Sequence, residues 1–413
     1  MSEASGICQR MYDLAKEHNG QNKYLTLNGV DILIIQRAED ADHILRLNAA
    51  NYVKNLSWLR QIIGASRFSE DGEKWRRRQQ ISQPFFNKID RDQLVSVTHK
   101  YALSALDTLI AKNDQPTLRD NVFRTLTSNI LLDSFFGCTL DDIGLDLDIL
   151  ADLMELGSAF SFSTENTVDD FYQKTKSLPR LRRQMLESFS NFRQSPICNT
   201  PLMQKLLEAE KGADKINLTQ ELTAFIAAGS ETSAATASWL CYLLAKNPDL
   251  QQKLRDDADT FWRSGEINWK HLSAFQSLTQ FVSETLRLFP PTPLITRTAL
   301  SDDVLGDQEI IKDQKIILSL IGIQHDRRFR DNPWQMTIDA PKSHKTSGDI
   351  MAFSMGPRVC GGKQFALIEL VTLLATFVQH ARFELTSDSD PAFHWKSQML
   401  HKNGVPVRVL PLC

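Results

Sequence analysis

One cysteine near the C-terminus, Cys360, stands in a segment whose residue types suggest metal binding. The segment, 353–362, contains three glycines and a proline, and it is followed by an apolar stretch, 364–377, that predicts a helix. The amides and the positive end of that helix favour a thiolate over a thiol. The glycines allow a bulky planar group to lie against the backbone, because they lack a Cβ atom. The segment predicts a metal-ligand loop; the alternative is a buried structural cysteine in a tight turn.

A second candidate segment, 222–239, predicts a long helix with unusually small side chains in its middle. Positions 227–238 are all small apart from Glu231. Since protein interiors are densely packed, something other than side chains should fill the space beside this helix. At about 3.6 residues per turn Gly229 and Thr232 share one face, so a flat cofactor can lie against Gly229 with the threonine hydroxyl beside it. The alternative is a small-residue helix that packs tightly on a neighbour.

Charged residues mark two further segments. Glu284 and Arg287 are three residues apart and can pair on one face of a predicted helix. Their apolar neighbours indicate burial, where such a pair needs further partners. The segment 294–299 predicts a strand that carries another arginine, Arg297.

These segments follow one another along the chain as 222–239, 284–287, 294–299 and 353–362, and in this order they resemble the cytochrome P-450 family of haem-thiolate monooxygenases. Five fixed positions of the family's haem-binding signature are filled here by Phe353, Gly356, Arg358, Cys360 and Gly362. The segment 228–233 is similar to the family's oxygen-binding helix, and Glu284 with Arg287 is similar to its Glu-x-x-Arg pair. The resemblance covers nearly the whole chain and implies the family's fold, a mainly α triangular structure with small β-sheets.

The resemblance implies that Cys360 is the axial ligand of haem b and that its thiolate pushes electron density onto the iron, which favours O–O cleavage. Glu231 and Thr232 correspond to the acid and the alcohol that deliver protons through water. The Thr232 hydroxyl is also expected to donate to the Ala228 carbonyl, which bends the helix locally. The Glu-x-x-Arg pair has a structural role, and the residues expected against the haem are Phe353, Gly356 and Gly229.

The haem propionates are expected to bind Arg297 and Arg358, together with Trp75 and Gln79. Gln79 departs from the family pattern, which has an arginine four residues after this tryptophan. An amide can donate to a carboxylate, but it brings no charge. Either Arg78 reaches around or another arginine compensates.

A second departure lies in 333–336, where the family's Pro-x-Arg-Phe unit supplies a third charge to the Glu-x-x-Arg pair. The arginine position is occupied here by Gln335. Either Gln335 supplies hydrogen bonds, or one of Arg327, Arg328 and Arg330 folds in. These positions do not touch oxygen, so the catalytic interpretation does not depend on them.

Apolar residues expected around the substrate favour a small lipophilic molecule; they are Ile63, Phe162, Phe225, Leu294 and Ile295. Phe162 belongs to a serine-rich segment, 157–164, which is either a mobile cover over the pocket or a loop with core anchors.

The chain of 413 residues is 42% hydrophobic and 23% charged with a formal net charge of −3, so nothing suggests nucleic acid as a partner. It has no signal-like N-terminus and no run of about eighteen apolar residues, so no membrane anchor is expected. Its six cysteines are scattered without paired spacing, as expected for reduced thiols. We expect a soluble, cytoplasmic protein of the bacterial type.

Residues 1–413 are expected to form one haem domain without a fused reductase, because the chain has no linker, no nucleotide-binding glycine loop and no iron–sulfur cysteine cluster. Electrons are then expected from a ferredoxin or flavodoxin-type donor with its own reductase. The expected reaction inserts one atom of O2 into the substrate and reduces the other to water. The alternatives are a peroxide-driven peroxygenase and a non-catalytic haem-binding protein.

Three local elements are also predicted. Residues 23–27 and 31–35 predict a hairpin with an Asn-Gly turn. Residues 38–47 predict a helix. The segment 405–410, after a turn at 402–404, predicts a C-terminal hairpin whose tip adjoins the pocket.

Overall fold

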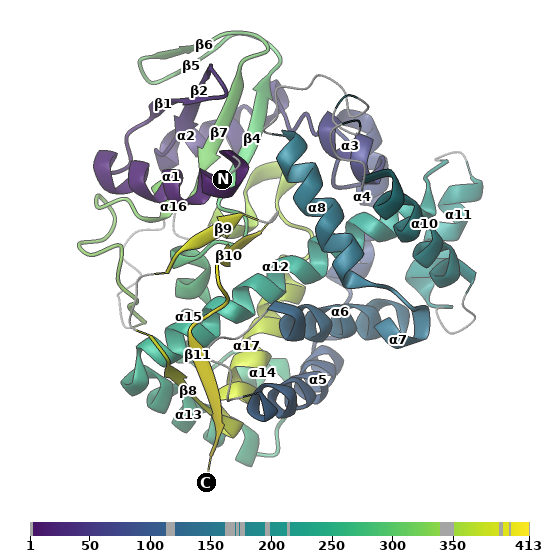
Figure 1. Ribbon diagram of the computed structural model, residues 1–413, viewed down its shortest axis with the longest axis vertical. Helices are drawn as coiled ribbons and strands as arrows, with labels where there is room; N and C mark the ends of the chain where they lie inside the picture. Colours follow the sequence, from purple (N-terminus) through teal and green to yellow (C-terminus); the bar gives the residue numbers. More distant parts are fainter. Residues whose placement is uncertain are drawn as a thin grey trace.

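The computed structural model consists mainly of helices, with the largest sheet at one end of the molecule (Figure 1). It describes residues 3–112, 120–161, 170, 173, 178–194, 199–212, 215–338, 351–387, 391–395 and 398–412. In this described part of the chain, no helix is long and apolar enough to cross a membrane.

The helices, with short 3-10 and π turns labelled η, are α1 (Glu3–His18), α2 (Ala38–Asp42), η1 (His43–Leu47), η2 (Ala49–Asn51), α3 (Ser57–Ile63), α4 (Gly72–Asn87), α5 (Arg91–Ala111), α6 (Asp120–Phe136), α7 (Leu140–Ile143), α8 (Leu147–Ser161), α10 (Leu178–Gln194), α11 (Pro201–Lys211), α12 (Leu218–Lys246), α13 (Pro248–Arg263), α14 (Trp269–Leu272), α15 (Gln276–Leu288), α16 (Leu320–Gln324), η4 (Met351–Phe353), η5 (Gly356–Arg358) and α17 (Lys363–His380).

The strands are β1 (Lys23–Leu27), β2 (Val30–Ile35), β3 (Tyr52–Val53), β4 (Leu294–Ala299), β5 (Asp303–Leu305), β6 (Gln308–Ile310), β7 (Lys315–Ser319), β8 (Ala381–Leu385), β9 (Phe393–Trp395), β10 (Met399–His401) and β11 (Val407–Pro411). Five of them form a sheet in the order β1-β2-β7-β4-β3, in which β2 and β7 are parallel and the other neighbours antiparallel. The others form two-stranded antiparallel sheets, β10-β9, β11-β8 and β5-β6.

The central helix is α12, which crosses the middle of the molecule (Figure 1). Asn217 begins it, because its side chain accepts a hydrogen bond from the Gln220 amide at 3.0 Å. The helix packs against α6 and α17. Small residues in its middle allow these neighbours to come close, and α17 is apolar around most of its circumference, as expected for a buried helix.

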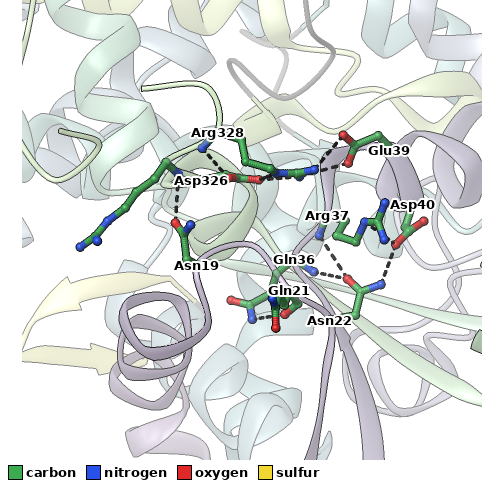
Figure 2. Close-up of polar contacts among 10 residues, drawn as sticks. Asn19, Gln21, Asn22, Gln36, Arg37, Glu39, Asp40, Asp326 and Arg328 are labelled. Atoms are coloured by element: carbon green, nitrogen blue, oxygen red, sulfur yellow. Dashed lines mark hydrogen bonds and ion pairs between the residues drawn. The ribbon is translucent and has the colours of Figure 1, made fainter. Parts of the chain in front are cut away.

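A polar network joins the end of α1 to the sheet and to the segment after α16 (Figure 2). The Asn22 side chain accepts from the Gln36 amide at 2.9 Å and donates to Asp40 at 2.6 Å. Asp326 accepts from the Arg328 side chain at 2.8 Å. These partly buried contacts hold the chain that follows α1 beside the five-stranded sheet.

The predicted N-terminal hairpin is confirmed: β1 and β2 pair antiparallel, and Asn28 and Gly29 have φ angles of 51° and 75°. This left-handed geometry is the one that an Asn-Gly turn favours. The helix expected over 38–47 is also present, although α2 ends at Asp42 and the chain continues as a π-helical turn to Leu47.

The predicted C-terminal hairpin is wrong. The strand before the turn, β10, pairs with β9, whereas the strand after it, β11, pairs with β8. The turn at 402–404 therefore connects two separate sheets, because β10 pairs with the strand just before it, β9, and β11 pairs with the more distant β8.

Candidate active site

The cysteine loop is held in shape by its backbone. The Cys360 amide donates to the Phe353 carbonyl at 2.8 Å, and the Lys363 amide, at the start of α17, donates to the Cys360 carbonyl at 3.3 Å. Gly356 has a φ of 66°, and a Cβ on it would lie 1.8 Å from the carbonyl oxygen of Leu45. A side chain would collide with backbone there, so this position requires glycine.

The Cys360 side chain is exposed, in contrast to Cys8, Cys138 and Cys241, which are buried. Desolvation nevertheless raises the pKa of the Cys360 thiol, and the backbone of Gly362 and nearby cations partly oppose this increase. Among the cysteines that the structure describes as free, Cys360 is thus the accessible one, and it is available to bind a group from outside the chain.

One stripe of α12 is accessible although most of the helix is buried. Ala228 is exposed, and Phe225 and Thr232 on the same face are half-buried. As predicted, the Thr232 hydroxyl donates to the Ala228 carbonyl, at 3.0 Å. An exposed alanine in the middle of a central helix requires open space beside it, which a planar group can fill.

Gly229 packs against α6 instead. A Cβ on Gly229 would lie 3.0 Å from both δ-carbons of Leu131, which is a tight contact. Glycine at this position therefore allows two helices to approach closely. Gly229 is half-buried and Ala228 is exposed, so Ala228 is the more accessible residue of this turn; the expected contact of Gly229 with the cofactor stays a prediction.

Glu231 points away from the accessible stripe and toward α6. Its carboxylate accepts from Nε of Arg124 at 3.0 Å, and both side chains are buried. Burial raises the pKa of Glu231, and Arg124 acts in the opposite direction. Arg124 also contacts Asp148 of α8 at 2.9 Å. The predicted acid is thus held in a buried ion pair, whereas the predicted alcohol, Thr232, lines the accessible stripe.

Three cations gather near the cysteine loop: Arg297, Arg358 and Lys54. Arg358 contacts Asp71 at 3.2 Å, and in the described part of the chain this is the only carboxylate that forms an ion pair with any of the three. Burial lowers the pKa of Arg297 and that of Arg358 to about 10 each. Burial, followed by repulsion from Arg358 and Arg297, also holds the pKa of Lys54 well below its ordinary value. The cluster therefore carries positive charge that an anionic group can balance.

The predicted propionate residues are only partly brought together. The Arg358 guanidinium lies over the Trp75 ring, 4.4 Å from its centroid. Arg78 does not compensate for Gln79, because it pairs with Glu221 of α12. Lys54 is a further basic residue beside Arg297 and Arg358, and it was missed because it lies in an irregular segment without a recognisable pattern.

The charge absent from 333–336 is supplied by Arg330. Glu284 and Arg287 form two hydrogen bonds of 2.9 Å, and both are buried. Arg330 contacts Glu284 at 3.0 Å. Arg287 also donates to the carbonyl of Gln335 at 3.0 Å. One of the three arginines considered from the sequence thus folds in, and Gln335 contributes through its backbone.

The predicted substrate residues lie in different surroundings. Ile63 and Leu294 are buried, with 4% and 7% of their surface exposed, and Ile295 is half-buried. The Phe225 ring packs on those of Phe86 and Phe135, each at 5.3 Å between centroids, so it belongs largely to an aromatic cluster. Phe162 lies outside the described residues.

The residues of this region fit the predicted haem. The exposed thiol of Cys360 can bind iron, and the stripe at Ala228 offers a surface without bulky side chains. The cations Lys54, Arg297 and Arg358 can bind two propionates. Each part of haem b thus has a counterpart here.

Comparisons with known proteins agree with this fit. The family model described as Cytochrome P450 matches residues 2–409. The chain is similar to Protein LUTEIN DEFICIENT 5, chloroplastic, of Arabidopsis thaliana, with 25% identity over 426 aligned positions that cover 92% of this chain and 70% of that protein. It is also similar to Carotene epsilon-monooxygenase, chloroplastic, of the same plant, with 26% identity over 253 positions that cover 59% of this chain and 46% of that protein.

A solved structure has the same fold. The crystal structure of the cytochrome P450DA heme domain superimposes with a TM-score of 0.82, covering 98% of this chain and 92% of that one. Sequence identity is 18%, so this likeness concerns the fold alone.

Proposed function

Because this chain belongs to the cytochrome P450 family of monooxygenases, whose cofactor is haem b, we propose that it inserts one oxygen atom from O2 into a small lipophilic substrate. The main support is the accessible thiol of Cys360 together with the accessible stripe of α12 at Ala228 and Thr232. A thiolate ligand favours O–O cleavage, and the small side chains of the stripe leave room for a cofactor beside the Thr232 hydroxyl.

The chain's own residues have three tasks in this proposal. Cys360 holds the iron as a thiolate, while Lys54, Arg297 and Arg358 bind the propionates. The Thr232 hydroxyl orients water on the accessible stripe and Glu231 supplies protons to it, after partial release from Arg124. When bound, haem activates O2 for insertion into an organic substrate.

We further propose that residues 1–413 act as one haem domain that receives electrons from a separate ferredoxin or flavodoxin-type protein and its reductase. The support is that the sequence has no glycine-rich nucleotide-binding loop after a predicted strand and no iron–sulfur cysteine cluster. Arg76 and Arg77 on α4 are exposed and offer positive charge to an acidic donor. The soluble bacterial type and the cytoplasmic location stay predictions, because the relatives include chloroplastic proteins.

The lipophilic substrate class is supported by the apolar residues Ile63, Leu294 and Ile295. One relative is named a carotene monooxygenase, so a carotene belongs in any substrate panel, beside a fatty acid and a small cyclic hydrocarbon. The test is a titration of the haem-loaded protein in which a change of haem spin state reports binding.

Turnover then separates the candidate functions. We expect product with O2, NADPH and a surrogate ferredoxin system, and isotope from labelled O2 in that product. Product with peroxide alone but none with O2 and donor would favour the peroxygenase. Substrate binding with no product under either condition would favour a non-catalytic haem-binding protein.

A further inference from the structure

Arg67, in the segment between α3 and α4, is a cation that the haem site described above does not use. Its amide donates to Glu221 of α12 at 3.0 Å. Its guanidinium donates to Ser82 Oγ at 2.9 Å and to Gln83 Oε1, and lies 5.6 Å from the centroid of the Phe86 ring. The side chain is therefore held firmly against one face of α4.

This guanidinium lies beside the residue that follows the ligand. A Cβ on Gly361 would be 2.4 Å from Nη2 of Arg67 and 2.7 Å from Oε1 of Gln83. Gln83 also donates to the Gly361 carbonyl at 3.4 Å. The space that a side chain at 361 would occupy is thus taken by Arg67 and Gln83, and the cation is brought close to the backbone of the Cys360 loop.

The charge of Arg67 is not cancelled by a close acid. Its side-chain partners, Ser82, Gln83 and Phe86, are neutral, and no carboxylate within 4.0 Å of its guanidinium is found in the described part of the chain. The nearby Glu221 is paired with Arg78. The Arg67 guanidinium is therefore a cation that lies against the backbone of the Cys360 loop without a carboxylate beside it among the described residues.

We propose that Arg67 is a positioning residue for the reaction, acting through Cys360: its fixed positive charge, packed on Gly361, stabilises the thiolate and makes the haem easier to reduce. The inference rests on the proposed function and deepens it. In the step concerned, one electron passes from the donor protein to the ferric haem, and no proton or leaving group is involved. Because reduction adds negative charge to the site, a nearby fixed cation favours the reduced form.

The test measures the reduction equilibrium of haem-loaded variants against a reference dye. Arg67→Gln should lower the equilibrium constant for reduction about tenfold, which is about 59 mV for a one-electron couple. Arg67→Lys, which keeps the charge, should recover most of this loss. Lys88→Gln removes an exposed cation just after the end of α4, the helix against which Arg67 packs. It should have no effect on the reduction equilibrium, because solvent screens its charge.

A second variant leaves Arg67 in place. Gln83→Glu puts a carboxylate against the guanidinium and should lower the equilibrium constant in the same direction, which keeps the proposal testable if Arg67→Gln does not load haem. Equal reduction equilibria for Arg67→Gln and the parent, or equal losses for the Lys and Gln variants, would make Arg67 a packing residue. If the potential shifts as expected but no substrate is oxidised, the proposed function fails and the role of Arg67 stands.

Discussion

Two neighbouring residues of α12, Glu231 and Thr232, have contrasting surroundings, and this contrast decides how each can be tested. Substitution of Glu231 would remove the buried one of the two carboxylates that contact Arg124, so a loss of activity would be mixed with a loss of stability. The Thr232 hydroxyl is accessible and donates to its own helix. Its removal should therefore perturb the fold little, which makes it the cleaner position.

Thr232→Ala should keep haem loading and substrate binding while lowering product per NAD(P)H several-fold. Without the hydroxyl, water on the accessible stripe loses its orientation, and proton delivery becomes less selective. Oxygen uptake should fall much less than product, with hydrogen peroxide accounting for the difference. Thr232→Ser should restore coupling. If the alanine variant stayed fully coupled, Thr232 would be a packing residue, and the proton path would have to be sought at Ser230 or Ser233.

Single residues could be predicted from the sequence where a short segment sets their spacing. Cys360, Arg358 and Arg297 are of this kind. Lys54 is not, because it reaches Arg297 through the pairing of β3 with β4, in which Val53 lies opposite Thr298. That pairing joins segments far apart in the chain, so no local sequence pattern predicts it.

At the scale of elements, the contact between α12 and α17 encloses an acid. The Ser233 hydroxyl donates to Glu369 Oε2 at 2.6 Å, and the other carboxyl oxygen has no partner among the described residues. Burial raises the pKa of Glu369 from 4.5 to about 8, and Ser233 opposes this only in part. The carboxyl is therefore neutral in the folded protein at pH 7, although it ionises in the unfolded chain.

The stability of the protein should depend on pH through Glu369. Below about pH 4.5 both states bind the proton; between about 4.5 and 8 only the folded state does, so stability falls as pH rises, by at most about 1.4 kcal/mol per pH unit. Above about pH 8 the loss is complete. The thermal midpoint of haem-loaded Glu369→Gln, measured relative to that of the parent protein, should therefore rise as the pH increases from 5 to 8. Parallel profiles would contradict this, and the exposed Glu17→Gln serves as control.

Elements could be predicted where local chemistry decides them. The Asn28-Gly29 turn requires positive φ at both positions, and β1 and β2 follow from it. The C-terminal turn at 402–404 resembled a hairpin for the same local reason. The prediction failed because β10 already pairs with β9 on its N-terminal side, and β11 pairs with β8, a more distant segment that no local pattern identifies.

At the scale of the whole molecule, the distribution of exposed charge indicates where an electron donor can bind. Arg76 and Arg77 on α4 have side chains 63% and 57% exposed, and Gln83 of the same helix contacts Gly361. A donor bound to α4 would therefore lie near the cysteine loop. Their contacts with Glu73, at 3.3 and 3.4 Å, are exposed and add little to stability.

Arg76→Glu combined with Arg77→Glu should slow reduction by an acidic donor several-fold at low salt, because steering is lost, and the difference should shrink as salt is added. The measurement is stopped-flow reduction at several ionic strengths. Arg263→Glu on α13, at the opposite end of the molecule (Figure 1), is a matched control with a similar exposed pair. Equal rates for the double variant and the parent at every salt concentration would place the docking site elsewhere.

Cys360 is the proposed ligand of the haem iron, and the absorption spectrum of the reduced, CO-bound protein tests this directly. The parent should show the red-shifted band of a thiolate ligand, Cys360→Ala should lose it, and Cys8→Ala, which alters a buried cysteine of α1, should retain it. A thiolate-type band that persists in Cys360→Ala would mean that another residue binds the iron, and it would contradict the site described here.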